Sequence, residues 1–130
     1  MGRIRHLEED DPLIWSVIGA AIVVHRWLGP GLHESAYQVC LSHEWTVRGI
    51  AHETEVKIPI LYKDVHLDCG YRLDIVIPGQ LVVELKSVLD FHPIHHAQIL
   101  TYLRLTGIPR GLLLNFNVPV RKDGMKRFAL

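Results

Sequence analysis

The stretch LVVELKS, residues 81–87, reads as a buried β-strand whose second half carries charged side chains. Glu84 and Lys86 are unexpected there, because charged groups are almost never fully buried unless they are paired or bind a metal. Side chains at positions i and i+2 of a strand share a face, so Glu84 and Lys86 lie on the same side as Val82. The strand is therefore predicted to be apolar on both faces at its start and polar on one face at its end.

The preceding stretch, YRLDIVI at residues 71–77, repeats this pattern with one carboxylate, Asp74, among apolar residues. The tripeptide PGQ at residues 78–80 predicts a tight hairpin turn between the two stretches. Counting outward from a turn pairs residues that are about equally distant from it. The hairpin is therefore predicted to bring Asp74 and Glu84 to neighbouring positions.

Two neighbouring carboxylates in an apolar setting repel each other, and a divalent cation between Asp74 and Glu84 would remove that cost. Oxygen ligands of this kind suit Mg²⁺ or Mn²⁺. Lys86 would then lie beside the metal, where an ammonium group can orient or help to deprotonate a water molecule, or stabilise charge on a phosphate. The alternative is an ordinary ion pair of Glu84 with Lys86 at the wet end of an edge strand, which would contribute little.

Helical periodicity dominates the first third of the chain. Apolar residues recur at intervals of three and four over residues 12–28, with Asp11 as the expected N-cap and a proline in the first turn. The tripeptide GPG at residues 29–31 ends this helix. A second helix is expected over residues 32–48, with Gly49 as its C-terminal cap. Its expected inward-facing residues are Ala36, Tyr37, Cys40, Leu41 and Trp45.

The period changes from 3.6 to 2 in the middle of the chain. Residues 53–62 alternate between apolar and polar side chains, and Pro59 places this strand at an edge or a bulge. A second strand is expected over residues 65–77, broken or bulged around Gly70, before the strand at residues 81–87.

A further helix and a further strand follow. The helix is expected over residues 93–106, with Gly107 as its stop, and the strand over residues 111–116. The expected apolar positions of this helix are Ile94, Ala97, Ile99, Leu100 and Leu103. A basic tail then contains Arg121, Lys122, Lys126 and Arg127. The element order is ααβββαβ, which predicts one α/β domain over residues 1–130 without a linker.

Composition limits the classes of function. The 130 residues are 48% hydrophobic, and 14 basic residues balance 14 acidic ones, which argues against a protein that coats nucleic acid by bulk charge. No charged-then-apolar leader and no apolar run of bilayer length is present, so a cytoplasmic protein without a membrane partner is expected. The nine histidines, including His95 and His96, show no zinc-site spacing.

Two sets of residues resemble known motifs. One set has the order of the D…(D/E)xK…QxxxY pattern in the RecB-like branch of the PD-(D/E)xK nuclease superfamily: Asp74, Glu84, Lys86, Gln98 and Tyr102. The stretch GPGLHESAY, with Gly31, Glu34 and Tyr37, is similar to the motif of the GxxExxY protein family, a small single-domain group in that superfamily. The similarity extends from about residue 18 to residue 128. It implies a restriction-endonuclease-like core, in which helices flank a mixed central sheet.

The resemblance also implies a catalytic centre. Asp74 and Glu84 would ligate Mg²⁺ or Mn²⁺, with the backbone carbonyl of Leu85 as a further ligand. Glu34 matches the acidic position that completes the metal site from a helix packed on the sheet. Lys86 would be the catalytic lysine.

The remaining matched residues would support this centre. Gln98 and Tyr102 are four residues apart, on one helical face, and would support the site or contact the substrate backbone. RecB-like relatives often use a helical histidine as a metal ligand; His25 or Glu34 could fill that role, and Glu34 is preferred. Tyr37 is expected in the core or behind the ligands, with its hydroxyl near Glu34.

The resemblance thus implies a Mg²⁺-dependent nuclease that hydrolyses phosphodiester bonds of nucleic acid, with DNA as the expected substrate. RNA, and either endonuclease or exonuclease action, stay open. The alternative is a non-catalytic interaction or regulatory module of a larger assembly. Neutral net charge and small size favour this alternative, whereas carboxylates inside a sheet disfavour it. A domain of this size offers little surface to enclose a duplex, so a homodimer or a protein partner is a further expectation.

Overall fold

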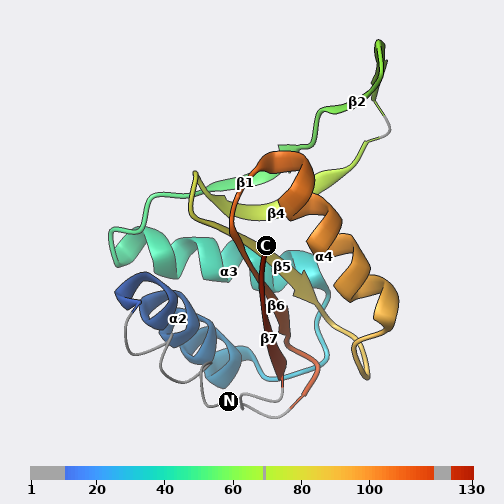
Figure 1. Ribbon diagram of the computed structural model, residues 1–130. Helices are drawn as coiled ribbons and strands as arrows, with labels where there is room; N and C mark the ends of the chain where they lie inside the picture. Colours follow the sequence, from blue (N-terminus) through green and yellow to red (C-terminus); the bar gives the residue numbers. More distant parts are fainter. Residues whose placement is uncertain (1–10, 69, 119–123) are drawn as a thin grey trace, which may run out of the picture.

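The computed structural model describes residues 11–68, 70–118 and 124–130, and in it helices flank a mixed five-stranded sheet (Figure 1). Two helices come first, α2 (Pro12–Leu28) and α3 (Glu34–Val47). Five strands follow: β1 (Glu53–Lys57), β2 (Ile60–Tyr62), β3 (Val65–Leu67), β4 (Arg72–Ile77) and β5 (Leu81–Lys86). The last described elements are α4 (Pro93–Thr106), β6 (Arg110–Asn115) and β7 (Met125–Ala129). The predicted fold class, an α/β core with a mixed sheet between helices, is confirmed.

The strand order in the main sheet is β1-β4-β5-β6-β7. Strands β5 and β6 pair in parallel, and the other neighbouring strands pair antiparallel. A parallel pair needs a crossover connection, which α4 supplies. Strands β2 and β3 form a separate two-stranded ribbon that projects from the sheet at the top of Figure 1.

The helix ends follow the local signals in the sequence. Asp11 Oδ1 accepts a hydrogen bond from the backbone N–H of Ile14 at 3.3 Å, so it caps α2 as predicted. Gly107 ends α4 in the left-handed conformation, with φ 74°. The predicted limits of these two helices, 12–28 and 93–106, are confirmed. Helix α3 begins at Glu34, two residues later than predicted.

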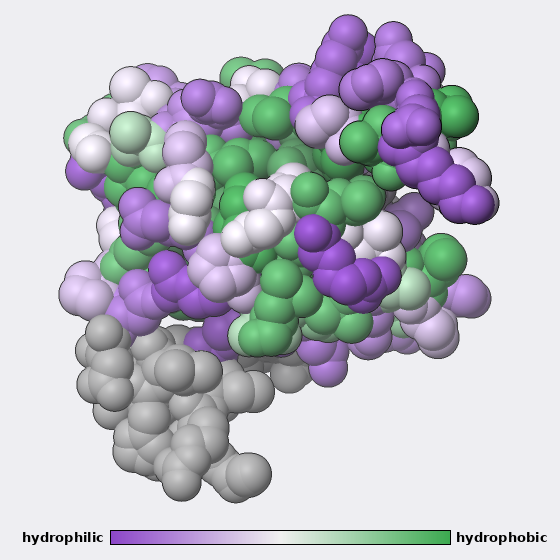
Figure 2. Space-filling model, turned by 45° about the horizontal axis from the view of Figure 1, so that its top comes forward, coloured by the Kyte–Doolittle hydropathy of each residue, from purple (hydrophilic) through white to green (hydrophobic). Residues whose placement is uncertain are grey.

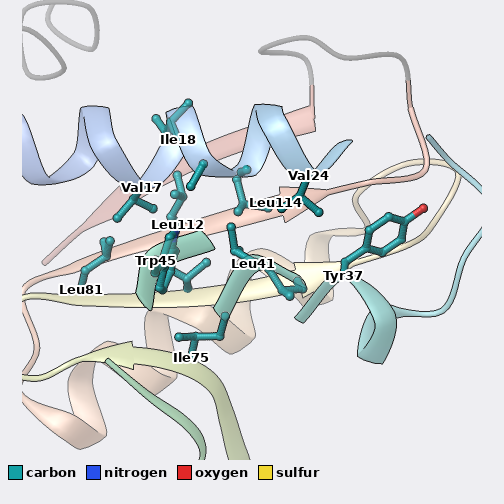
Figure 3. Close-up of a cluster of buried hydrophobic side chains, with 14 of the residues drawn as sticks. Val17, Ile18, Val24, Tyr37, Leu41, Trp45, Ile75, Leu81, Leu112 and Leu114 are labelled. Atoms are coloured by element: carbon teal, nitrogen blue, oxygen red, sulfur yellow. The ribbon is translucent and has the colours of Figure 1, made fainter. Parts of the chain in front are cut away.

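The larger apolar core lies between one face of the sheet and the helices α2 and α3 (Figure 3). Leu81, Val83 and Leu85 of β5 belong to it, whereas Val82 belongs to a second core together with Leu103 of α4. The division of β5 into two faces, predicted from its alternation, is confirmed. The sheet therefore has an α2–α3 face and an α4 face, and Glu84 shares the α4 face with Val82.

The order of elements differs from the predicted ααβββαβ in three places, of which the last is the additional strand β7. The strand predicted over residues 53–62 is divided at Pro59, which has no N–H to donate, although the N–H of Ile58 still bonds to the carbonyl of Tyr71 at 3.0 Å. The strand predicted over residues 65–77 is divided into β3 and β4, and Gly70, with φ 75°, lies in the gap. The predicted break around Gly70 is confirmed.

The predicted basic tail is wrong for the residues that the structure describes. Lys126 and Arg127 belong to β7, where they pair with Leu113 and Leu112 of β6. Backbone pairing with a buried neighbour makes this segment a strand despite its polar side chains. Arg121 and Lys122 lie outside the described residues.

Apolar side chains also remain on the surface. Ile94 and Ala97, two of the expected apolar positions of α4, are exposed, Ile94 at 52%, whereas Ile99 and Leu103 are buried. Hydrophobic residues gather toward the middle of the face in Figure 2, with hydrophilic residues around them. None of the helices in the described ranges is long and apolar enough to cross a bilayer.

Candidate active site

Asp74 and Glu84 meet where the β4–β5 hairpin opens. The strands pair as far as Ile75 with Val83, which places the two carboxylates at the next position. The backbone N–H of Asp74 donates to Glu84 Oε2 at 2.7 Å, and the backbone N–H of Leu85 donates to Asp74 Oδ2 at 2.8 Å. Each carboxylate therefore accepts a hydrogen bond from the backbone of the opposite strand. The juxtaposition predicted by counting from the turn is present.

The environment of this pair disfavours charge on both groups. Glu84 is only 6% exposed, and burial, followed by the negative charge of Asp74, raises the pKa of Glu84 to about 8. Burial also raises the pKa of Asp74, while the hydrogen bond from Leu85 opposes this increase. A positive charge between the two carboxylates would reverse both shifts.

Lys86 supplies one such charge from the end of β5. It is half-buried, shares a face with Glu84, and pairs in register with Asn115 of β6. Its ammonium lowers the pKa values of both Asp74 and Glu84, although less than burial raises them. Lys86 therefore lies within electrostatic reach of both carboxylates.

Glu34 approaches the pair from the first residue of α3. Its Oε2 accepts a hydrogen bond from the backbone N–H of Ser87 at 3.2 Å, and its charge raises the pKa values of Asp74 and Glu84. Within residues 11–68, 70–118 and 124–130, however, no three His, Cys, Asp or Glu side chains form a group that could hold a metal ion. Backbone hydrogen bonds join Asp74 and Glu84 to each other's strands. Glu34 is instead bonded to Ser87, the residue that follows β5.

The loop before α3 is tied down by Tyr37. Its hydroxyl donates to the carbonyl of Gly29 at 2.5 Å and accepts from the N–H of Leu32 at 3.2 Å. Its ring stacks on Phe116 with centroids 4.3 Å apart, and Figure 3 shows it at one end of the core with its hydroxyl pointing away. Gly31, with φ 104°, gives the loop a conformation that other residues rarely adopt. The described hydrogen bonds of the Tyr37 hydroxyl thus go to the loop backbone rather than to Glu34.

The same loop is attached to the end of β5. The hydroxyl of Ser87 donates to the carbonyl of Leu32 at 2.7 Å, while its backbone N–H donates to Glu34. Ser87 therefore joins the loop, the start of α3 and the strand that carries Glu84 and Lys86. Nothing in the spacing of the sequence indicated this role, because the contacts span more than fifty residues.

His25 bonds to the chain just after β6. It is buried in α2, and its Nε2 lies 2.9 Å from the carbonyl oxygen of Phe116. Because a carbonyl oxygen only accepts, Nε2 is the donor in this contact, and Nδ1 keeps its lone pair. The described contacts of His25 therefore support the end of β6.

Helix α4 brings further polar groups to the pair. Gln98 and Tyr102 both line a groove along α4, and burial, followed by the charge of Glu84, raises the pKa of Tyr102. Two residues join them that the motifs did not indicate. Tyr71 contributes to the raised pKa of Tyr102, and burial, followed by the charge of Lys86, lowers the pKa of His95. His95 also caps the start of α4. Its Nδ1 accepts a hydrogen bond from the backbone N–H of His92, the N-cap residue, at 3.0 Å.

Comparisons with known proteins agree with this geometry at the level of a family. A family model described as the PD-(D/E)XK nuclease superfamily matches residues 11–128, which includes every residue of the site. No curated protein and no solved structure matches the chain.

Proposed function

The chain belongs to the PD-(D/E)XK nuclease superfamily, and from this premise we propose that it is a divalent-metal-dependent nuclease that hydrolyses phosphodiester bonds of nucleic acid, DNA in the first instance. The observation that supports this proposal most is the pairing of buried Glu84 with half-buried Asp74, with Lys86 on the face of Glu84. Burying two carboxylates side by side destabilises a fold unless they bind something positive.

The donor set fits Mg²⁺ or Mn²⁺. Backbone hydrogen bonds hold Asp74 Oδ2 and Glu84 Oε2, which orients both groups and leaves Oδ1 and Oε1 as the oxygens that could coordinate a cation. These cations commonly take one or two protein carboxylates and keep several waters. A complete cage of side chains is therefore not required. The backbone carbonyl of Leu85 and the carboxylate of Glu34 are the further ligands that we assign.

Each residue has a distinct task in the proposed reaction. A divalent cation, when bound, supplies Lewis-acid activation of the phosphate and of the attacking water. Asp74 and Glu84 hold the cation, and the ammonium of Lys86 stabilises negative charge that develops on the phosphate oxygens. Gln98 and Tyr102 position the substrate strand from α4.

Cleavage assays with isosteric variants test the proposal. We expect wild-type protein to cut labelled single-stranded DNA, duplex DNA or RNA when Mg²⁺ or Mn²⁺ is present, and not in EDTA. Asp74→Asn, Glu84→Gln and Lys86→Met should each lower the rate by roughly a hundredfold or more, because each removes a charge used in the transition state. Glu53→Gln is the matched control, since Glu53 is an exposed carboxylate on the edge strand β1.

Circular dichroism on each variant separates lost chemistry from lost folding. Wild-type protein that cuts none of the three substrates with either metal contradicts the proposal. In that case the alternative, a non-catalytic interaction module, is tested by calorimetric titration with the same metals. Absence of metal binding favours the module.

A further inference from the structure

A groove of about 480 Å³ runs along helix α4 and is lined by residues that the metal chemistry does not use. Ile60 of β2 and Tyr71, just before β4, contribute to its walls, as do Ile94 and Leu105 of α4. Its volume lies within the ~300–1,000 Å³ of typical small-molecule sites. A ligand of the size of a few rings could therefore enter it.

Tyr102 links the groove to the carboxylate pair, although neither Asp74 nor Glu84 is among the residues that line it. Tyr102 lines the groove and is close enough to Glu84 and Asp74 for their charges to raise its pKa. Tyr71 lies only three residues before Asp74 along the chain and also lines the groove. A ligand in the groove would thus lie near the two carboxylates that we assign to the cation.

The chemistry of the lining does not suit a phosphate backbone. Its residues are apolar, aromatic, or carry only hydroxyl or amide groups, with no lysine or arginine among them. The chain as a whole is also neutral. Phosphate contacts are made mainly by basic side chains, so affinity in this groove must come from apolar and stacking contacts.

Exposed aromatic and aliphatic side chains in the groove offer stacking and apolar contacts. Tyr71 is 49% exposed and Ile94 is 52% exposed, although both line a concave surface. Nucleobases stack on aromatic rings in this way in proteins that bind single strands, and the stacking tolerates any base sequence.

We propose that this groove binds an unpaired nucleobase next to the scissile phosphate, stacked on Tyr71, so that the substrate is single-stranded or locally unpaired nucleic acid. The inference rests on the proposed nuclease function, which it deepens. A duplex keeps its bases stacked and paired, and extruding one of them costs a few kcal/mol. Single strands, ends and mismatches avoid that cost.

Binding assays in a Glu84→Gln background test the groove, because the nuclease proposal expects this variant to leave the oligonucleotide uncut during the measurement. Fluorescence anisotropy would compare a single-stranded oligonucleotide, its blunt duplex and a strand with abasic sites. We expect the single strand to bind more tightly than the duplex and the abasic strand. Tyr71→Ala should weaken binding of the single strand by ~5- to ~150-fold, the equivalent of ~1–3 kcal/mol for stacking on one base.

Control variants show whether an effect of Tyr71→Ala comes from the lost aromatic ring. Tyr71→Phe keeps the ring and should retain the affinity, and Tyr62→Ala removes an exposed tyrosine of β2 that does not line the groove. Ile94→Ala should also weaken the single-stranded complex, by a smaller factor than Tyr71→Ala. The inference is overturned if Tyr71→Ala binds all three probes like its parent, as a protein-docking groove would predict, or if the duplex binds best.

The nuclease proposal is judged by a separate measurement. If the wild type cleaves with Mg²⁺ or Mn²⁺ but Tyr71→Ala leaves affinity unchanged, the groove inference fails and the nuclease stands. If binding depends on Tyr71 and on the bases while the wild type cleaves nothing, the groove stands and the nuclease fails.

Discussion

Asp74 and Glu84 exchange hydrogen bonds across the open end of a hairpin: the backbone N–H of Asp74 donates to Glu84, and the N–H that follows Glu84 donates to Asp74. The bonds hold both carboxylates partly or wholly out of water: Glu84 is 6% exposed, and Asp74 is half-buried. The arrangement that orients the two carboxylates therefore also makes them repel each other when both are ionised. The site is preorganised for a cation, and without one it stores an unfavourable interaction.

The stability of the metal-free protein should fall as the pH rises. Glu84 keeps its proton up to a pKa of about 8 in the folded state, whereas the unfolded chain releases it near the ordinary value of ~4.3. Between these values the unfolded state binds fewer protons, so the free energy of unfolding decreases by up to ~1.4 kcal/mol per pH unit. Urea denaturation in EDTA from pH 5 to 8.5 would measure this slope. Glu84→Gln should flatten it, and equal slopes for both proteins would refute the assignment.

Binding of a divalent cation should release a proton. Metal ligation requires ionised carboxylates, and below its pKa of about 8 Glu84 is largely protonated. Affinity for Mg²⁺ or Mn²⁺ should consequently increase with pH. Calorimetry in buffers of different ionisation enthalpy counts the protons, with Asp74→Asn expected to abolish binding. A pH-independent affinity without proton release would contradict the assigned ligands.

Tyr37→Phe should loosen the loop that leads into Glu34 at the start of α3. The change removes the hydrogen bonds of the hydroxyl with Gly29 and Leu32 but keeps the ring on Phe116. We expect a loss of ~1 kcal/mol in the free energy of unfolding. If Glu34 ligates the cation, metal affinity should fall as well, whereas Tyr62→Phe on the exposed ribbon should change neither quantity. An unchanged metal affinity would remove Glu34 from the ligand set.

Two glycine substitutions should shift stability in opposite directions. Gly31 has φ 104° and open space where a Cβ atom would lie, so Gly31→Ala should destabilise the fold by ~1–2 kcal/mol through backbone strain alone. Gly19 lies inside α2 with only the flexible end of Arg48 nearby, at 3.3 Å. Gly19→Ala should therefore stabilise the fold by ~0.5–1 kcal/mol. Denaturant midpoints check both changes, and the same sign for both would contradict the argument.

Local signals explain the parts that were predicted from the sequence. The limits of α2 and α4 follow from caps and prolines that act within a few residues, such as Asp11 and Gly107. The proximity of Asp74 and Glu84 follows from the period of two and a tight turn, which together specify register. The helix caps and the hairpin turn each act between residues close together in the chain, so they can be identified from the sequence alone.

The tertiary structure alone decided the rest. Strand β7 forms because β6 offers a backbone edge, although its own side chains resemble a basic tail. Glu34 reaches Ser87, and Tyr71 reaches the groove along α4, through contacts between distant segments. Such contacts depend on how the helices and the β2–β3 ribbon pack on the sheet, which no local pattern encodes. The sequence by itself thus determined the carboxylate pair, and packing determined what surrounds it.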